Sequence, residues 1–150
     1  MPRSLHHAAL CVRDADASLR FYRDGLGLAV LMDERFDGDW PSLFDAPSTR
    51  LHSVFLGEPT APDAGVVELV TFDRDVDAGR AAPRPATGFF LLSFFVDLEA
   101  TLGRLDELGL GGERRRIEQP GPGGARVAMA TVRDPDGVLV ELIEAGPARA

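Results

Sequence analysis

Two apolar runs, far apart in the chain, share one pattern with a glutamate at its centre. The first is Val66-Val67-Glu68-Leu69-Val70, and the second, 73 positions later, is Leu139-Val140-Glu141-Leu142-Ile143. Branched apolar residues at this density predict β-strands. Because side chains alternate between the two faces of a strand, each glutamate shares a face with apolar neighbours. Either the strands lie at sheet edges, where the carboxylates reach water, or the carboxylates are paired, protonated or bound to a metal.

The repeat continues upstream of these runs. Residues 7–12 match residues 91–96 at an offset of 84, and the segments that follow match at an offset of 83. Each of these following segments predicts a helix with one apolar stripe, because its apolar residues recur at helical spacing: Ala15, Leu19, Tyr22 and Leu26, and Leu98, Leu102, Leu105 and Leu108. Each half of the chain therefore predicts a strand, a helix and further strands that end in the glutamate-bearing one.

Local signals place the ends of these elements. Asp14 and Asp97 are suited to be N-caps, because a carboxylate accepts hydrogen bonds from the free amides of a first helical turn. Gly27 and Gly109 are suited to end the helices. The sequence Asp-Pro-Asp-Gly at 134–137 predicts a type I turn that joins the last two strands as a hairpin.

The segment between the halves, residues 73–87, is rich in Asp, Ala and Pro and predicts a linker. We therefore expect one domain, residues 1–150. It would contain an N-terminal module of residues 5–72 and a C-terminal module of residues 88–145.

Composition excludes several classes of function. The net charge of −8 disfavours nucleic acid as a partner. The chain has no lysine, which excludes Schiff-base chemistry and a P-loop, and its lone Cys11 excludes an internal disulfide. No apolar run is long enough for a membrane span, and the first residues lack a secretory apolar region, so we expect a cytoplasmic protein.

The opening motifs HAALCVRD, from His7, and FYRDGLG, from Phe21, together with the closing DPDGVLVELIE, resemble the vicinal oxygen chelate superfamily. This superfamily includes glyoxalases, bleomycin-resistance proteins and extradiol dioxygenases. The match runs from about His6 to Glu144. The resemblance implies an α+β fold of two tandem βαβββ modules, which form a curved eight-stranded cavity with the helices outside.

The resemblance also implies a metal site with one ligand from the first and the last strand of each module. These positions hold His7, Glu68, Leu91 and Glu141. Leu91 departs from the pattern because leucine cannot bind a metal. Three ligands with open positions still suit a catalytic zinc, nickel, manganese or iron ion.

Two functions follow from these residues. The first is a metal-dependent lyase or isomerase that acts on a small molecule with adjacent oxygens through an enediolate, with Glu68 or Glu141 moving a proton. The alternative is a metal-free protein of the bleomycin-resistance type, which would bind a small molecule.

The expected contacts with the small molecule come from several segments. Residues 33–50 predict a long loop, whose aromatic side chains are suited to cover a flat ligand. The residues expected to contact substrate are His52, Trp40, Phe44, Phe95 and Ser93.

We also expect a homodimer. His7 and Glu141 would then meet either within one chain or across the two chains.

Overall fold

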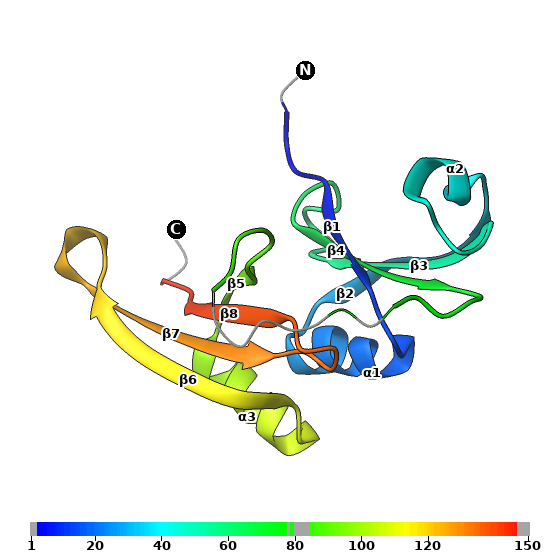
Figure 1. Cartoon of the computed structure of the whole chain (residues 1–150). Coiled ribbons are helices and arrows are strands. Elements are labelled where there is room, and N and C mark those ends of the chain that lie inside the picture. The colour runs from blue at the N-terminus through cyan, green and yellow to red at the C-terminus, as the bar shows by residue number, and fades with distance from the viewer. Residues whose placement is uncertain (1–2, 78, 80–84, 147–150) are drawn as a thin grey trace. The chain divides into compact units, whose positions relative to one another are not determined.

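The computed structural model describes residues 3–77, 79 and 85–146 (Figure 1). In this part of the chain, eight strands form two four-stranded sheets. The predicted α+β fold of two βαβββ modules is confirmed. The chain divides into two compact units, one with the first four strands and the other with the last four.

The N-terminal module has the strand order β1-β4-β3-β2. Strands β1 and β4 are parallel, and the other pairs are antiparallel. The helices of this module follow β1 and β2. Its elements are β1 (His7–Cys11), α1 (Ala15–Leu19), the π-helical segment η1 (Arg20–Gly25), β2 (Ala29–Asp37), α2 (Trp40–Phe44), β3 (Arg50–Gly57) and β4 (Val66–Phe72).

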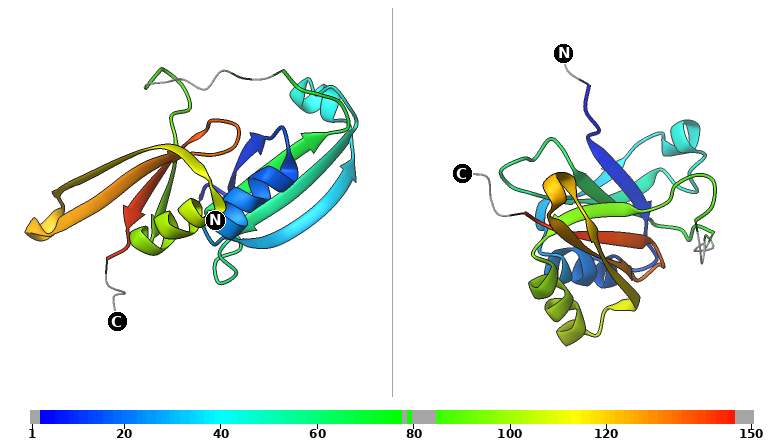
Figure 2. Two further views of the ribbon diagram at one scale, coloured as in Figure 1. Left: turned by 90° about the horizontal axis from the view of Figure 1, so that it is seen from below. Right: turned by 90° about the vertical axis from the view of Figure 1, so that its left-hand side faces the viewer.

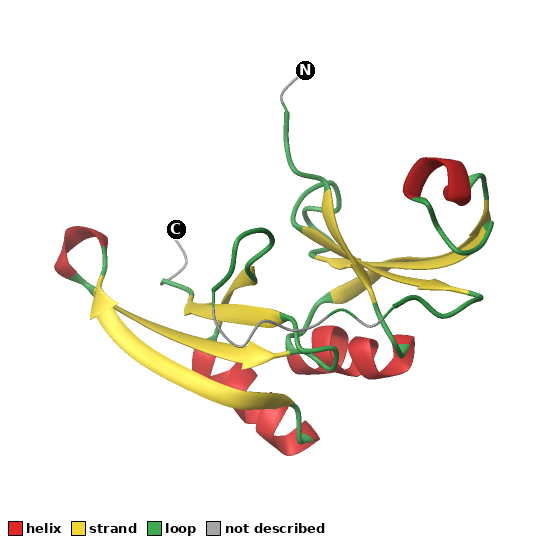
Figure 3. Cartoon of the chain, viewed as in Figure 1, coloured by secondary structure: helices red, strands yellow, loops and turns green. Residues whose placement is uncertain are grey.

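The C-terminal module repeats this topology with the order β5-β8-β7-β6. Figure 2 shows α3 along one face of this sheet, where it contacts β7 and β8. In Figure 3 no helix formed by the described residues lies on the other face of this sheet. The elements are β5 (Leu92–Val96), α3 (Leu98–Leu108), β6 (Gly111–Pro120), the short 3₁₀ segment η2 (Pro122–Gly124), β7 (Arg126–Arg133) and β8 (Leu139–Glu144).

Strand register confirms the repeat seen in the sequence. In the first sheet Ala9 lies opposite Glu68, and in the second Ser93 lies opposite Glu141. Ser93 follows Ala9 by the sequence offset of the first strands, 84, and Glu141 follows Glu68 by the offset of the last strands, 73. The first and last strands therefore pair in the same register in both modules. Both glutamates stand on inner strands, β4 and β8, and not on edge strands.

The predicted caps are confirmed. The Asp14 carboxylate accepts hydrogen bonds from the amides of Asp16 and Ala17, at 3.0 and 3.2 Å. The Asp97 carboxylate accepts one from the Ala100 amide at 3.0 Å. Gly109 ends α3 in the left-handed conformation, with φ of 67°, which a residue without Cβ adopts at little cost.

The first helix differs from the expected regular helix because it continues as the π-helical segment η1. A π turn holds one more residue than an α turn, and such insertions appear as single widened turns. The predicted helix from Asp14 to Gly27 is one residue longer than its repeat mate from Asp97 to Gly109. The wide turn absorbs that residue while Phe21 and Tyr22 both stay fully buried.

Each module has its own apolar core. Where α1 contacts the first sheet, η1 and the strands supply fully buried side chains, which include Phe21, Tyr22, Val54, Leu56 and Leu69. The second core lies between α3 and its sheet and includes Leu98, Leu105, Val132, Val140 and Leu142.

The predicted hairpin between β7 and β8 is confirmed. The Gly137 amide donates to the Asp134 carbonyl at 3.0 Å. The buried Asp134 carboxylate accepts from the amides of Asp136 and Val138, at 2.9 and 2.8 Å. These bonds satisfy backbone donors that the tight turn leaves without strand partners.

The predicted loop over residues 33–50 is wrong in two places. Strand β2 continues to Asp37 and pairs with β3, and residues 40–44 form α2. The charged residues 33–35 fit a strand here because β2 is an edge strand, where side chains and one side of the backbone reach water.

The predicted linker lies partly outside the described residues. Its described part, residues 73–77, 79 and 85–87, contains neither helix nor strand. Within the described ranges, no helix is long and apolar enough to cross a membrane.

Candidate functional site

Glu68 has partners on both of its carboxylate oxygens. Its Oε2 lies 3.2 Å from His7 Nε2, and its Oε1 accepts a hydrogen bond of 2.6 Å from Ser53 Oγ. The Glu68 side chain is 13% exposed. Strand register explains this arrangement. Ala9 and Phe55 lie opposite Glu68 on the two neighbouring strands. His7 and Ser53 lie two positions before them, so their side chains are on the same face as Glu68.

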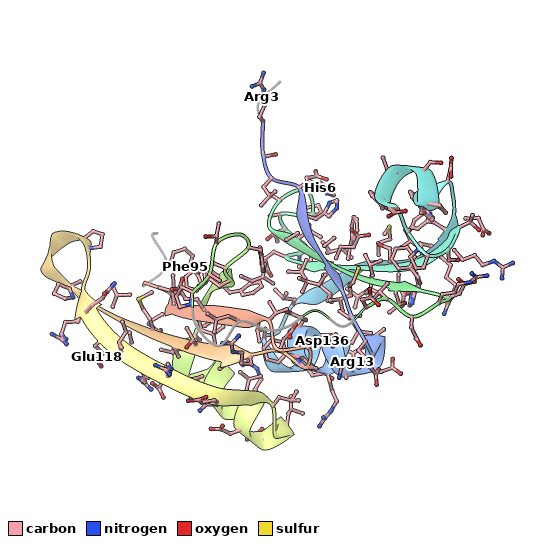
Figure 4. The ribbon with its side chains drawn as sticks, in the orientation of Figure 1. Arg3, His6, Arg13, Phe95, Glu118 and Asp136 are labelled. Atoms are coloured by element: carbon pink, nitrogen blue, oxygen red, sulfur yellow. The ribbon has the colours of Figure 1, made fainter. Side chains whose placement is uncertain are left out.

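His7 is held by its neighbour as well as by Glu68. His6 Nδ1 and His7 Nδ1 are 2.8 Å apart, and both rings lie close to the ring of Phe55, with centroids 5.8 and 5.3 Å from it. Strand β1 begins at His7, so His6 lies just before the strand. Its side chain therefore need not point to the face opposite to His7, as it would if both residues were in a regular strand. Figure 4 shows His6 at the start of β1. The two histidines and Glu68 thus form one polar group at the end of this strand.

Glu141 is held by one oxygen only. Its Oε1 accepts a hydrogen bond of 2.7 Å from Ser93 Oγ on the parallel strand β5. Among the described residues, no hydrogen bond or ion pair engages its Oε2. The Glu141 side chain is half-buried. One carboxylate oxygen therefore remains free to bind an ion or a proton.

Leu91 lies directly before β5, two residues ahead of Ser93, as His7 lies two residues ahead of Ala9. The register thus places Leu91 at the position equivalent to His7. Its side chain offers no ligand, so the C-terminal module contributes one candidate ligand where the N-terminal module contributes two.

His52 lies on the face of the first sheet opposite to Glu68. Phe55 pairs with Glu68, so these two side chains share a face. His52 is separated from Phe55 by an odd number of positions, and because side chains alternate between the faces of a strand, it points to the opposite face. Its Nε2 contacts Asp33 Oδ1 at 2.5 Å. The structure therefore does not bring His52 together with His7 and Glu68, and its contact with substrate stays a prediction.

The aromatic candidates fall into two groups. Trp40 and Phe44 of α2 stack nearly parallel, with ring centroids 5.8 Å apart and 7° between the planes. The Trp40 ring packs over Gly38, where a Cβ would come within 2.7 Å of it. Phe95 is 77% exposed and shares the face of Ser93 and Glu141, away from α3 (Figure 4). Each group presents aromatic surface, and contact with substrate stays a prediction for both.

Three residues near Glu68 were not among those predicted from the sequence. Ser53 and His6 contact the Glu68–His7 pair directly, and Cys11 stands on the same face of β1 as His7. Cys11 is an exposed residue, but partial burial of its thiol raises the pKa of this group, and the negative charge of Glu68 raises this pKa further. Sequence offered no signal for Ser53, because its partner is set by the pairing of β3 with β4.

The donors present suit a divalent metal ion, since one imidazole and two carboxylates provide borderline nitrogen and hard oxygen ligands. His7 and Glu68 already stand side by side, with Ser53 holding the other Glu68 oxygen. Among the described residues, no group of three or more His, Cys, Asp or Glu side chains is close enough to hold an ion. The N-terminal module therefore places two candidate donors, His7 and Glu68, side by side.

Residues 4–142 match the model of the Glyoxalase/Bleomycin resistance protein/Dioxygenase superfamily. The chain belongs to this superfamily. Curated members resemble it over most of its length. It is 37% identical to the lactoylglutathione lyase-like protein terB of Aspergillus terreus, over 93% of this chain and 74% of that protein. It is 32% identical to the lactoylglutathione lyase of Haemophilus influenzae, over 92% of this chain and 90% of that one.

Solved structures of the superfamily share the fold. A glyoxalase family protein from Bacillus cereus superposes with a TM-score of 0.72 at 18% identity, over 96% of this chain and 95% of that one. At that identity the likeness establishes the fold alone. Glyoxalase I from Zea mays, at 25% identity and a TM-score of 0.66, is matched over 96% of this chain and 45% of its own length.

Proposed function

We propose that this protein is a glyoxalase-type lyase or isomerase, with a divalent metal ion bound by His7, Glu68 and Glu141. The observation that carries the proposal is the contact between His7 Nε2 and Glu68 Oε2, 3.2 Å apart on adjacent strands. The similarity to proteins named lactoylglutathione lyase supports the reaction class. The free Oε2 of Glu141 supports a third ligand or an acid–base group.

The proposed substrates are small molecules with a hydroxyl and a carbonyl on neighbouring carbons, such as a hemithioacetal of an α-ketoaldehyde. A bound divalent ion would supply Lewis-acid polarisation of these two oxygens. The Glu141 carboxylate, once released from the ion, would accept the C–H proton at Oε2, which leaves the enediolate monoanion of the substrate, and would return that proton to the adjacent carbon, while the hydroxyl proton passes from its own oxygen to the neighbouring one. The net change is an isomerisation, so no external oxidant or reductant is needed.

The second candidate is a metal-free binding protein, and Leu91 favours it because this position carries no ligand. The exposed Phe95 also favours it, as an aromatic surface beside a carboxylate suits an apolar or cationic ligand. This candidate predicts tight binding of a small molecule without turnover.

Metal content separates the two candidates. Plasma mass spectrometry on tag-free protein is expected to find near-stoichiometric zinc, nickel, manganese or iron, which falls in the Glu141→Ala variant. Hemithioacetals and α-hydroxy ketones would then be screened for turnover. Protein that takes up none of these four ions after incubation would contradict the metal-dependent enzyme.

Subunit exchange tests the proposed homodimer. His7→Ala and Glu141→Ala chains would be mixed, and metal binding by the mixture measured against each variant alone. Recovery of about a quarter of the wild-type sites in the mixture, by random pairing of two chains, indicates ligands from both chains. No recovery, with dimers present, indicates ligands from a single chain.

A further inference from the structure

Ser53 is a buried polar residue in the middle of β3. It is 2% exposed, and its Oγ donates to Glu68 Oε1 over 2.6 Å. Its neighbours in β3, Val54 on the other face and Leu51 on its own, are apolar and buried. A hydroxyl in such a place is unfavourable unless it forms a hydrogen bond, and Glu68 provides the acceptor.

The two oxygens of Glu68 are thereby assigned different roles. A carboxylate can rotate about its last side-chain torsion, where the preferences are broad. The bond to Ser53 opposes this rotation because it engages Oε1 from the β3 side, while Oε2 stays beside His7 Nε2 on the β1 side. Without Ser53, both oxygens would be free to turn toward either neighbour.

We infer that Ser53 is a positioning residue, whose hydroxyl holds Glu68 so that Oε2 and His7 Nε2 converge on one ion. This inference rests on the proposed function, since the ion is the one proposed there. It assigns Ser53 no contact with substrate or metal. Hydrogen bonds to a metal-binding carboxylate orient it, and their loss typically lowers metal affinity about 10- to 100-fold.

The chain offers a matched control in Ser18. Ser18 is fully buried in α1, and its Oγ has no hydrogen-bond partner in the described part of the chain. Replacing either serine by alanine removes one buried hydroxyl, but only Ser53→Ala removes a bond to Glu68. A comparison of the two variants therefore separates the loss of the Glu68 bond from the loss of a buried hydroxyl.

The experiment is a titration of metal-free protein with Co²⁺, followed by calorimetry and by the visible absorption of the bound ion. Ser53→Ala is expected to bind about 10- to 100-fold more weakly than wild type and to change the absorption spectrum. Ser53→Thr keeps the hydroxyl and is expected to restore binding to within a few-fold. Ser18→Ala is expected to match wild type. Equal affinity and spectrum for Ser53→Ala and wild type would overturn the inference.

Further measurements cover the other outcomes. If Ser53→Ala does not fold, Ser53→Val replaces it, because valine matches the shape of threonine but has no hydroxyl to donate; affinity equal to wild type would overturn the inference. If wild type binds neither Co²⁺ nor any of the four ions named above, the proposed function fails, and the role of Ser53 is decided by a crystal structure of metal-free Ser53→Ala. Movement of Glu68 Oε2 away from His7 supports the positioning role, and an unchanged Glu68 rotamer overturns it.

Discussion

Glu68 Oε2 lies 3.2 Å from His7 Nε2, although the two residues belong to the first and last strands of their module. The parallel pairing of β1 with β4 creates this contact, because it sets His7 one diagonal step from Glu68 on the same face. An imidazole and a carboxylate at this separation can share a proton or an ion. The first prediction tests which of these the pair does.

His7→Ala and Glu68→Gln are each expected to reduce bound metal to a small fraction of the wild-type content, because each removes one of two adjacent donors. Metal content by plasma mass spectrometry after loading and desalting is the measurement. His52→Ala is the matched control and is expected to retain the metal, because His52 contacts Asp33 on the opposite face. Loss of metal in His52→Ala but not in His7→Ala would contradict this assignment.

Leu91→His is expected to tighten metal binding at least about tenfold, which corresponds to about 1.4 kcal/mol. The substitution places an imidazole at the position equivalent to His7, where the superfamily pattern expects a ligand. Phe90→His adds the same side chain one position earlier, where Phe90 is 49% exposed, and is expected to leave affinity unchanged. Competition with a chelating dye measures both variants, and equal affinities would argue against a site that includes position 91.

Ser18→Ala is expected to stabilise the fold by about 1 kcal/mol, because it removes a buried hydroxyl without a partner and alanine favours helix. Urea unfolding, monitored by circular dichroism, measures the change in the free energy of unfolding. Ser42→Ala in α2, where Ser42 is exposed, is the comparison and is expected to stay within about 0.5 kcal/mol of wild type. A destabilised Ser18→Ala would show that the hydroxyl has a partner in solution.

Asp134→Ala is expected to destabilise the protein by about 1–3 kcal/mol, because the amides of Asp136 and Val138 lose a buried acceptor. Asp134→Asn keeps one acceptor oxygen and is expected to cost less. Thermal unfolding of the three proteins ranks them. The same midpoint for Asp134→Ala and wild type would show that water replaces the carboxylate in this turn.

The Cys11 thiol is expected to react slowly with iodoacetamide at neutral pH, because burial and, second, Glu68 raise its pKa. Glu68→Gln is expected to lower this pKa but to leave it above that of a free thiol, since burial is the larger cause. Alkylation rates as a function of pH give both values. As the pH rises into the alkaline range, the Cys11 thiol loses its proton in the unfolded chain before it does so in the folded chain. Ionisation of Cys11 therefore lowers the free energy of unfolding as the pH rises. A pKa unaffected by Glu68→Gln would contradict the assigned influence of Glu68.

Several features of this protein were determined by the sequence itself. The repeat of the glutamate-bearing strands, the caps at Asp14 and Asp97, the stop at Gly109 and the turn at 134–137 were all predicted and are confirmed. These features depend on residues close together in the chain, whose hydrogen bonds and periodicity are local. The resemblance to the superfamily rests on the same local motifs.

Tertiary structure alone decided the partners of the candidate site residues. Which strands are inner ones, which face His52 occupies and which hydroxyl reaches Glu68 all follow from strand order and register. The same holds for the length of β2, whose charged residues pair with β3 at a sheet edge. Register depends on contacts between distant segments, and a shift of one residue would turn every side chain to the other face. Local sequence therefore named His7 and Glu68 as candidates, whereas only the packed sheet placed Ser53 beside them.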